Sequence, residues 1–160
     1  MQNQLIEQFA IGGPTLRTAI EGLTREELRA RPGPGGPGAW SIAELVIHLA
    51  DSDAVAINRM KWVIAEDNPP LPGFDESAWA RSLHNDEQSV ADAVTLFEVN
   101  RRQFARVLRK LPAEMFARFG THSERGKVTL LDLLKTYTGH LDHHLKFLYE
   151  KRKWLGKPVK

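Results

Sequence analysis

The sequence predicts an all-α protein folded as a four-helix bundle, and three observations favour this class. Four long segments carry apolar residues at spacings of three, four and seven positions, which is typical of helices with one buried face. Segments rich in proline, glycine and polar residues separate the four patterns. No segment indicates a β-hairpin, and no internal repeat of about 20 to 50 residues is apparent. Four long helices in one chain pack most simply as a bundle.

Length and composition predict a single domain over residues 1–160. A chain of 160 residues can form one hydrophobic core but is too short for two of ordinary size. Hydrophobic residues make up 42% of the chain and charged residues 26%, which is typical of soluble globular proteins. The pI is near 9.0, but a net charge of +2 produces no concentrated cationic field. We therefore do not expect nucleic-acid binding.

Residue usage also limits the cell compartment and the chemistry. The chain begins without the features of a signal peptide and has no apolar run long enough to span a membrane, so we expect a cytoplasmic protein with no membrane partner. No cysteine is present, which excludes disulfides, thiolate zinc sites and a cysteine nucleophile. Any bound metal ion would be held by nitrogen and oxygen ligands.

The first helix is expected over residues 4–22, with a kink or a restart at Gly12, Gly13 and Pro14. Thr24 and the glutamate three positions later then fit a capping box that starts a short helical turn. The seven residues at 32–38 are all proline or glycine, so they cannot continue a helix. They predict a long loop between the first two long helices.

The second long helix is expected to begin at Ser41, which forms another capping box with Glu44. Its apolar pattern continues until Asn68 and the two prolines that follow it. The segment 71–85 should be a loop with a helical turn near residues 74–79.

Two further helices follow. The third is expected from Asp86 to Lys110, with acidic residues at its start and basic residues at its end, as the helix dipole favours. Residues 117–127 form a polar connection. The most regular amphipathic pattern then begins near Leu130 and ends before Gly156.

The last helix places two of the six histidines on its apolar face. His140 and His144 are four residues apart, so their imidazoles share one side of the helix, whereas His143 points outward. Burying an unpaired polar group costs about 1 to 3 kcal/mol, so two inward imidazoles require partners. They are either core histidines bonded to carbonyl or carboxylate groups, or a His-x-x-x-His pair that binds one metal ion.

His48 is the candidate for a third metal ligand. It lies at the edge of the apolar face of the second helix, so it is either an inner ligand or a surface residue. Adjacent helix axes in a bundle lie about 8 to 10 Å apart, which two imidazoles can bridge through one ion. Three nitrogen ligands would leave coordination positions open, as in catalytic sites, for an activated water or a substrate thiolate.

Several segments resemble one protein family. The segment 40–53 (WSIAELVIHLADSD) resembles the second-helix motif of the DinB/YfiT-like superfamily, and 139–144 (GHLDHH) resembles its last-helix motif. The segments 74–79 (FDESAW) and 122–126 (HSERG) resemble parts of one branch of this superfamily. The resemblance thus covers most of the chain from Trp40 onward.

The resemblance implies an up-down-down-up four-helix bundle that forms a homodimer. It also implies a divalent metal, typically nickel or zinc, held by His48, His140 and His144. The implied function is a metal-dependent enzyme that acts on a small molecule, either a hydrolase or an S-transferase or isomerase that uses a low-molecular-weight thiol. Bacillithiol, mycothiol and glutathione are the thiols used in this superfamily.

Two other classes of function stay open. One is a non-catalytic metal-binding or stress-response module that keeps the bundle but turns over no substrate. The other is a DNA-associated protein, which the mild net charge does not favour. An open coordination position facing a cavity would distinguish an enzyme from a binding module.

A few polar residues allow two interpretations, one functional and one purely structural. His122, in the connection before the last helix, either contacts substrate or supports the site, or is a solvated loop residue. Glu44 and Asp51 lie one turn on either side of His48, so each either orients the imidazole or is an exposed helix carboxylate. Arg101, Arg102 and the basic residues 151–153 are expected on the solvated surface.

Overall fold

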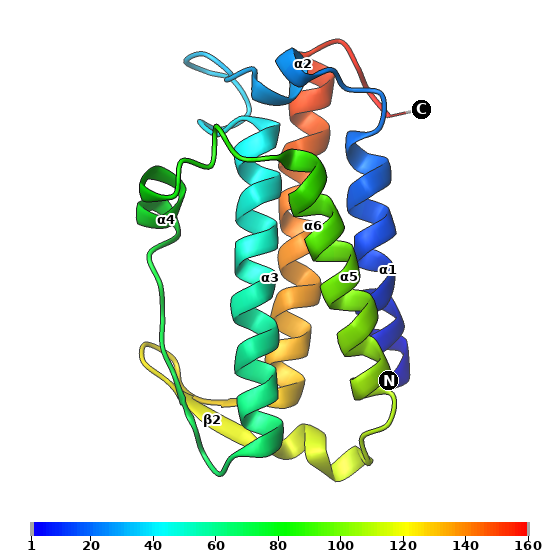
Figure 1. Ribbon diagram of the computed structural model, residues 1–160, viewed down its shortest axis with the longest axis vertical. Helices are drawn as coiled ribbons and strands as arrows, with labels where there is room; N and C mark the ends of the chain where they lie inside the picture. Colours follow the sequence, from blue (N-terminus) through cyan, green and yellow to red (C-terminus); the bar gives the residue numbers. More distant parts are fainter. Residues whose placement is uncertain (1, 160) are drawn as a thin grey trace.

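Four long helices form the bundle in a computed structural model that describes residues 2–159 (Figure 1). They are α1 (Gln2–Ile20), α3 (Ile42–Ala65), α5 (Val90–Leu108) and α6 (Leu130–Trp154). In Figure 1, α1 and α6 run upward while α3 and α5 run downward. Helices α1 and α3 each pack against both α5 and α6, so α1 and α3 stand at opposite corners. The predicted four-helix bundle is confirmed, with the up-down-down-up order that the family resemblance implies.

The apolar faces of the helices meet in two buried clusters at different heights. One cluster includes Phe9, Met60, Phe104 and Leu134, and the other includes Leu16, Leu45, Phe97 and Leu141. Fully burying a side chain of this kind contributes about 1.5 to 3 kcal/mol. Between the two clusters, each long helix carries small or polar residues. These are Gly12 on α1, Ser52 and Asp53 on α3, Arg101 on α5, and residues 138–140 on α6.

Capping side chains explain where the helices start. The Ser41 hydroxyl accepts a hydrogen bond from the Glu44 N–H at 3.1 Å, and the Glu44 carboxylate accepts one from the Ser41 N–H at 2.8 Å. This is the predicted capping box, and it begins α3. Thr24 makes the same arrangement at the start of α2 (Arg25–Arg29), and Thr129 pairs with Asp132 at the start of α6.

The structure decides two expectations about helix boundaries. Helix α1 continues through residues 12–14, so the expected restart was wrong. The glycines of this segment allow close packing between helices. A Cβ atom on Gly13 would lie 2.7 Å from the Glu98 Cα atom of α5. Helix α5 begins at Val90 and not at Asp86, because Ser89 is its N-cap and accepts from the Asp92 N–H at 3.2 Å.

A small sheet closes one end of the bundle, so the expectation that the chain has no hairpin was wrong. Strands β2 (Phe119–His122) and β3 (Gly126–Thr129) form an antiparallel hairpin, and β1 (Pro70–Leu71) pairs parallel to β2. Gly126 adopts a φ of 68°, which favours glycine. Strands of two to four residues are too short to show alternation in the sequence, and β1 finds its partner about fifty residues away.

The remaining elements are short. Helix α4 (Glu76–Ser82) corresponds to the helical turn expected near residues 74–79. Asp75 caps it by accepting a hydrogen bond from the Ala78 N–H at 2.8 Å. A 3-10 turn, η1 (Ala113–Ala117), leads from α5 to the sheet. Among residues 2–159, no helix is both long and apolar enough to cross a membrane.

Candidate metal centre

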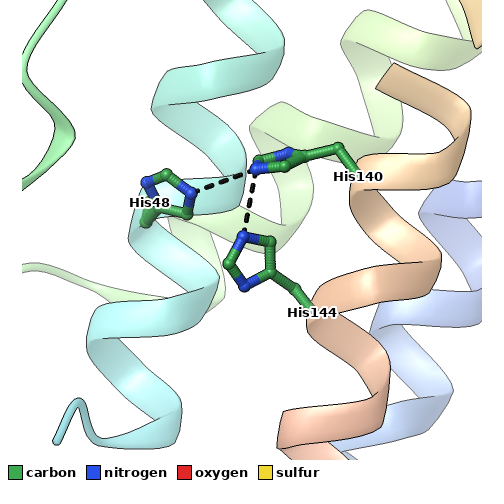
Figure 2. Close-up of side chains that lie close together, drawn as sticks. All are labelled: His48, His140 and His144. Atoms are coloured by element: carbon green, nitrogen blue, oxygen red, sulfur yellow. Dashed lines mark hydrogen bonds between the residues drawn. The ribbon is translucent and has the colours of Figure 1, made fainter. Parts of the chain in front are cut away.

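Three histidines from two antiparallel helices meet inside the bundle (Figure 2). His48 comes from α3, and His140 and His144 come from successive turns of α6. The Nε2 atom of His140 lies 3.3 Å from that of His48 and 3.0 Å from that of His144. One ligand atom from each ring lies within 4.8 Å of the other two. The packing of α3 against α6 therefore brings His48 to the pair formed by His140 and His144, and the three nitrogen donors could hold one ion.

Burial keeps these three rings neutral. The side chain of His48 is only 2% exposed, so the alternative of a surface residue was wrong. Desolvation, followed by the neighbouring His144, lowers the pKa of His48 to about 4. Desolvation and the adjacent histidines likewise bring the pKa of His140 to about 3 and that of His144 to about 4. Neutral imidazoles offer the lone pairs that a metal ion requires.

The hydrogen bonds of the cluster do not match those of ordinary core histidines. Within residues 2–159, the ring nitrogens contact one another and, at 3.5 Å, the Ser52 hydroxyl, but no backbone carbonyl. The nearest carboxylate oxygen is that of Glu76, 3.8 Å from the His48 Nε2 atom. Three converging neutral nitrogens that bond to no carbonyl or carboxylate fit a divalent ion that takes imidazole ligands.

His143 lies outside the cluster, as predicted. It is exposed, and its ring packs 5.1 Å from the ring of Phe147 on the outer face of α6. His48 is packed on its other side by Trp40, whose ring centroid is 5.1 Å away.

The two carboxylates that flank His48 in sequence make no hydrogen bond to it. Glu44 is buried, caps α3 and pairs with Arg31 at 2.6 Å. Asp51 is half-buried, and its Oδ2 atom has no partner among the described residues. Glu76 approaches the cluster instead, from α4. Glu76 was not among the residues expected at the site, although it lies in the segment 74–79 that carries part of the family resemblance.

His122 is part of a cavity wall and not a solvated loop residue. It ends β2, is 6% exposed, and lines a cavity of about 200 Å³ together with His140. Its Nδ1 atom accepts a hydrogen bond from the Glu124 N–H at 3.2 Å. Desolvation, followed by the charges of Arg59 and Arg125, lowers its pKa. The same cavity is also lined by Ser52, Glu76 and Tyr137.

A second, apolar cavity of about 240 Å³ reaches the cluster from the other side. Its walls include Trp40, Leu45, His144 and Phe147, with the end of the Pro/Gly loop at its rim. Lys151 donates hydrogen bonds to the carbonyls of Pro37 and Gly38, which fixes this rim.

Some basic residues expected on the surface are buried. Arg101 is 1% exposed and pairs with Asp53, and Lys151 and Arg152 are 3% and 8% exposed. Each donates hydrogen bonds to carbonyl or carboxylate oxygens, although the Nη1 atom of Arg101 has no partner among the described residues. Arg102 and Lys153 are exposed, as expected.

Comparison with known proteins agrees with this architecture. The family model described as "DinB superfamily" matches residues 8–148. The chain belongs to the DinB superfamily. The resemblance of its histidine-containing segments to this family is thereby confirmed.

Relatives of this DinB-superfamily chain carry names that refer to metal. A protein of Geobacillus thermodenitrificans named "Putative metal-dependent hydrolase" is 31% identical over 142 residues, which cover 88% of this chain and 78% of the relative. "Putative metal-dependent hydrolase YfiT" of Bacillus subtilis is 27% identical with the same coverage. A solved structure, described as "YfiT from Bacillus subtilis is a probable metal-dependent hydrolase with an unusual four-helix bundle topology", superimposes with a TM-score of 0.88 at 24% identity. The superposition covers 97% of this chain and 87% of the YfiT chain, and the two chains have the same fold.

Proposed function

We propose that this protein is a metal-dependent hydrolase of small molecules and that His48, His140 and His144 hold its divalent ion. The observation that carries the proposal is the convergence of three neutral imidazoles at cavities on both sides of the cluster. An ion held only by three protein ligands keeps positions for water and substrate, which is typical of catalytic sites. The names of the relatives support hydrolysis.

The surrounding residues supply the other requirements of hydrolysis. When bound, a zinc or nickel ion would supply Lewis acidity and lower the pKa of water. The Glu76 carboxylate, 3.8 Å from His48, is placed to accept a proton from the attacking water. The desolvated walls keep the three imidazoles neutral and thus available as ligands.

The direct test combines metal analysis with a hydrolysis assay. Untagged protein is offered zinc, nickel and manganese, its metal content is measured by elemental mass spectrometry, and ester and amide substrates are screened. We expect about one equivalent of metal and metal-dependent turnover, both lost in His144→Ala. The matched control His143→Ala changes an exposed neighbour and should keep both.

Three outcomes would contradict this function. No bound metal would make the cluster a set of core histidines, and bound metal without turnover would favour a non-catalytic binding module. Turnover that requires bacillithiol, mycothiol or glutathione would replace hydrolysis with thiol transfer.

A further inference from the structure

The three-histidine cluster lies between two cavities of different chemistry. On α3, Leu45 lines the apolar cavity and Ser52 lines the polar one, with His48 between them. On the antiparallel α6, His144 lines the apolar cavity and His140 the polar one. Seven residues of helix span about 10 Å. A ligand that enters both cavities would therefore be about this long, with its centre at the histidines.

The apolar cavity suits a hydrocarbon group. Trp40, Leu45 and Phe147 form its walls, and Phe147 is 42% exposed although it is a large apolar side chain. Its volume of about 240 Å³ exceeds that of a 150 Å³ apolar cavity of the kind known to bind benzene. Lys151 holds the rim by its bonds to the carbonyls of Pro37 and Gly38, so its charge is directed at the loop.

The polar cavity presents hydrogen-bond donors. Because His122 Nδ1 accepts from the Glu124 N–H, the proton of the neutral ring must be on Nε2. Within residues 2–159, Nε2 makes no hydrogen bond and is not a buried orphan atom, so it is free to donate. Arg59 is 5% exposed. Its Nη atoms donate to the Tyr137 hydroxyl and the Pro72 carbonyl, and its Nε atom is buried without a partner among the described residues, so Arg59 contributes charge to this wall. Arg125 adds a second cation to this wall.

Two carboxylates also line the polar cavity, and their positions determine which ligand charge the cavity favours. Glu76 lies at the histidine cluster, 3.8 Å from His48, where it serves the reaction proposed above. Glu124 lies toward Gly73: a Cβ atom there would be 2.9 Å from its Oε1 atom. The His122 Nε2 atom and the Arg125 guanidinium, beside the buried charge of Arg59, are therefore left to bind an anionic group, which charge-assisted donors recognise best.

We propose that the substrate is an amide or ester that joins an apolar acyl group to a small carboxylate-bearing group. The acyl chain lies in the cavity of Trp40, Leu45 and Phe147, and the carboxylate lies against His122 and Arg125, near the charge of Arg59. This inference rests on the proposed hydrolase function and specifies its substrate class. Hydrolysis adds the hydroxyl of water to the acyl carbon and the proton to the departing nitrogen or oxygen, so the products are a fatty carboxylate and an amine or alcohol that bears a carboxylate.

The test measures binding separately from turnover, with N-hexanoylglycine as the probe. Its affinity is determined by titration calorimetry on zinc-loaded protein and on protein treated with a chelator. The comparison ligands are N-acetylglycine, which lacks four methylenes, and N-hexanoylglycinamide, which lacks the carboxylate. We expect N-hexanoylglycine to bind about tenfold or more tightly than N-acetylglycine and about threefold or more tightly than the amide, in both protein forms.

Two surface substitutions with matched controls assign each end of the probe to one of the two cavities. Phe147→Ala should remove most of the advantage over N-acetylglycine, whereas Leu96→Ala, an exposed leucine on α5, should not. Arg125→Gln should remove most of the advantage over the amide, whereas Lys127→Gln, on the same hairpin, should not.

The inference is wrong if N-hexanoylglycine binds no more tightly than N-acetylglycine and no more tightly than N-hexanoylglycinamide. It is equally wrong if the Phe147→Ala and Arg125→Gln variants bind N-hexanoylglycine as the parent does. It is also wrong if Phe147→Ala converts a dimer to a monomer without changing affinity, because a second copy of the chain would then fill the apolar cavity. Loss of metal binding or of hydrolysis alone, with the affinity pattern intact, would overturn the proposed function and leave this specificity standing.

Discussion

Arg101 and Asp53 form a buried ion pair that joins α5 to α3 in the middle of the bundle. The guanidinium donates from Nε and Nη2 to the Asp53 carboxylate at 3.0 and 2.9 Å, and Nη2 also donates to the Tyr137 carbonyl of α6 at 2.8 Å. The rings of Phe9 and Phe97 enclose it at 4.5 and 4.3 Å. Both charged side chains are 1% exposed. This pair thus fixes all four helices near the level of the histidines.

Removing Arg101 should destabilise the fold strongly. Arg101→Met leaves the Asp53 carboxylate buried without its cation, so we expect a loss of about 3 to 5 kcal/mol in the free energy of unfolding. Adding Asp53→Leu should recover part of that loss, because the orphaned charge is then gone. Urea unfolding measures both variants, with Arg102→Met as the exposed control. A loss in Arg101→Met no larger than that of the control would contradict this role.

Gly12 and Gly139 should respond to alanine in opposite ways. A Cβ atom on Gly12 would lie 2.3 Å from the Arg101 Nη1 atom and 2.8 Å from a Leu141 methyl carbon, and the ion pair prevents Arg101 from moving away. Nothing lies within 4 Å of a Cβ atom on Gly139. Gly12→Ala should therefore lower the melting temperature, whereas Gly139→Ala should raise stability by up to about 1 kcal/mol through helix propensity. Equal effects of the two changes would refute the close-packing argument.

The metal-free protein should become less stable as the pH falls below neutrality. Burial and mutual repulsion lower the pKa values of His48, His140 and His144 to about 3 to 4, whereas the unfolded chain binds these protons near pH 6.5. Between these values the unfolded state binds more protons, so stability is full above about pH 6.5 and is lost toward pH 4. Urea unfolding in the presence of a chelator at pH 7 and pH 5 measures the slope. His144→Leu should reduce it and His143→Ala should not; a pH-independent free energy would contradict the burial of neutral rings.

The His122 ring should be neutral and protonated on Nε2 at pH 7. The Glu124 N–H donates to its Nδ1 atom, and desolvation with Arg59 and Arg125 lowers its pKa. Long-range proton–nitrogen NMR spectra distinguish the two tautomers and the imidazolium, and His122→Gln identifies the signal by its disappearance. Observation of the Nδ1–H tautomer or of a charged ring would contradict the donor role.

The Pro/Gly loop should loosen when Lys151 is shortened. Lys151 donates to the carbonyls of Pro37 and Gly38, so Lys151→Met removes both bonds while keeping most of the apolar stem. Amide hydrogen exchange over residues 33–38 should accelerate about tenfold or more, because about 1.4 kcal/mol of lost local stability gives a tenfold change in opening. The exposed neighbour Lys153→Met is the control. Unchanged exchange in Lys151→Met would show that the loop is held by other contacts.

The sequence determined the helical class, most helix boundaries and the histidine pair on α6. These features depend on local signals: apolar spacing, capping pairs such as Ser41 with Glu44, and the four-residue interval between His140 and His144. The third histidine required a family resemblance, because His48 lies at the edge of an apolar face and spacing alone left it between the core and the surface.

Only the tertiary structure decided the features that depend on residues distant in the chain. The burial of Arg101 required Asp53 from another helix to neutralise it, and the sheet required β1 to meet β2 about fifty residues later. Glu76 and His122 approach the histidine cluster and its cavity from a short helix and a hairpin whose positions are set by packing. The spacing of residues along the chain carries no information about such partners, because their contacts form only when the four helices close around a common core.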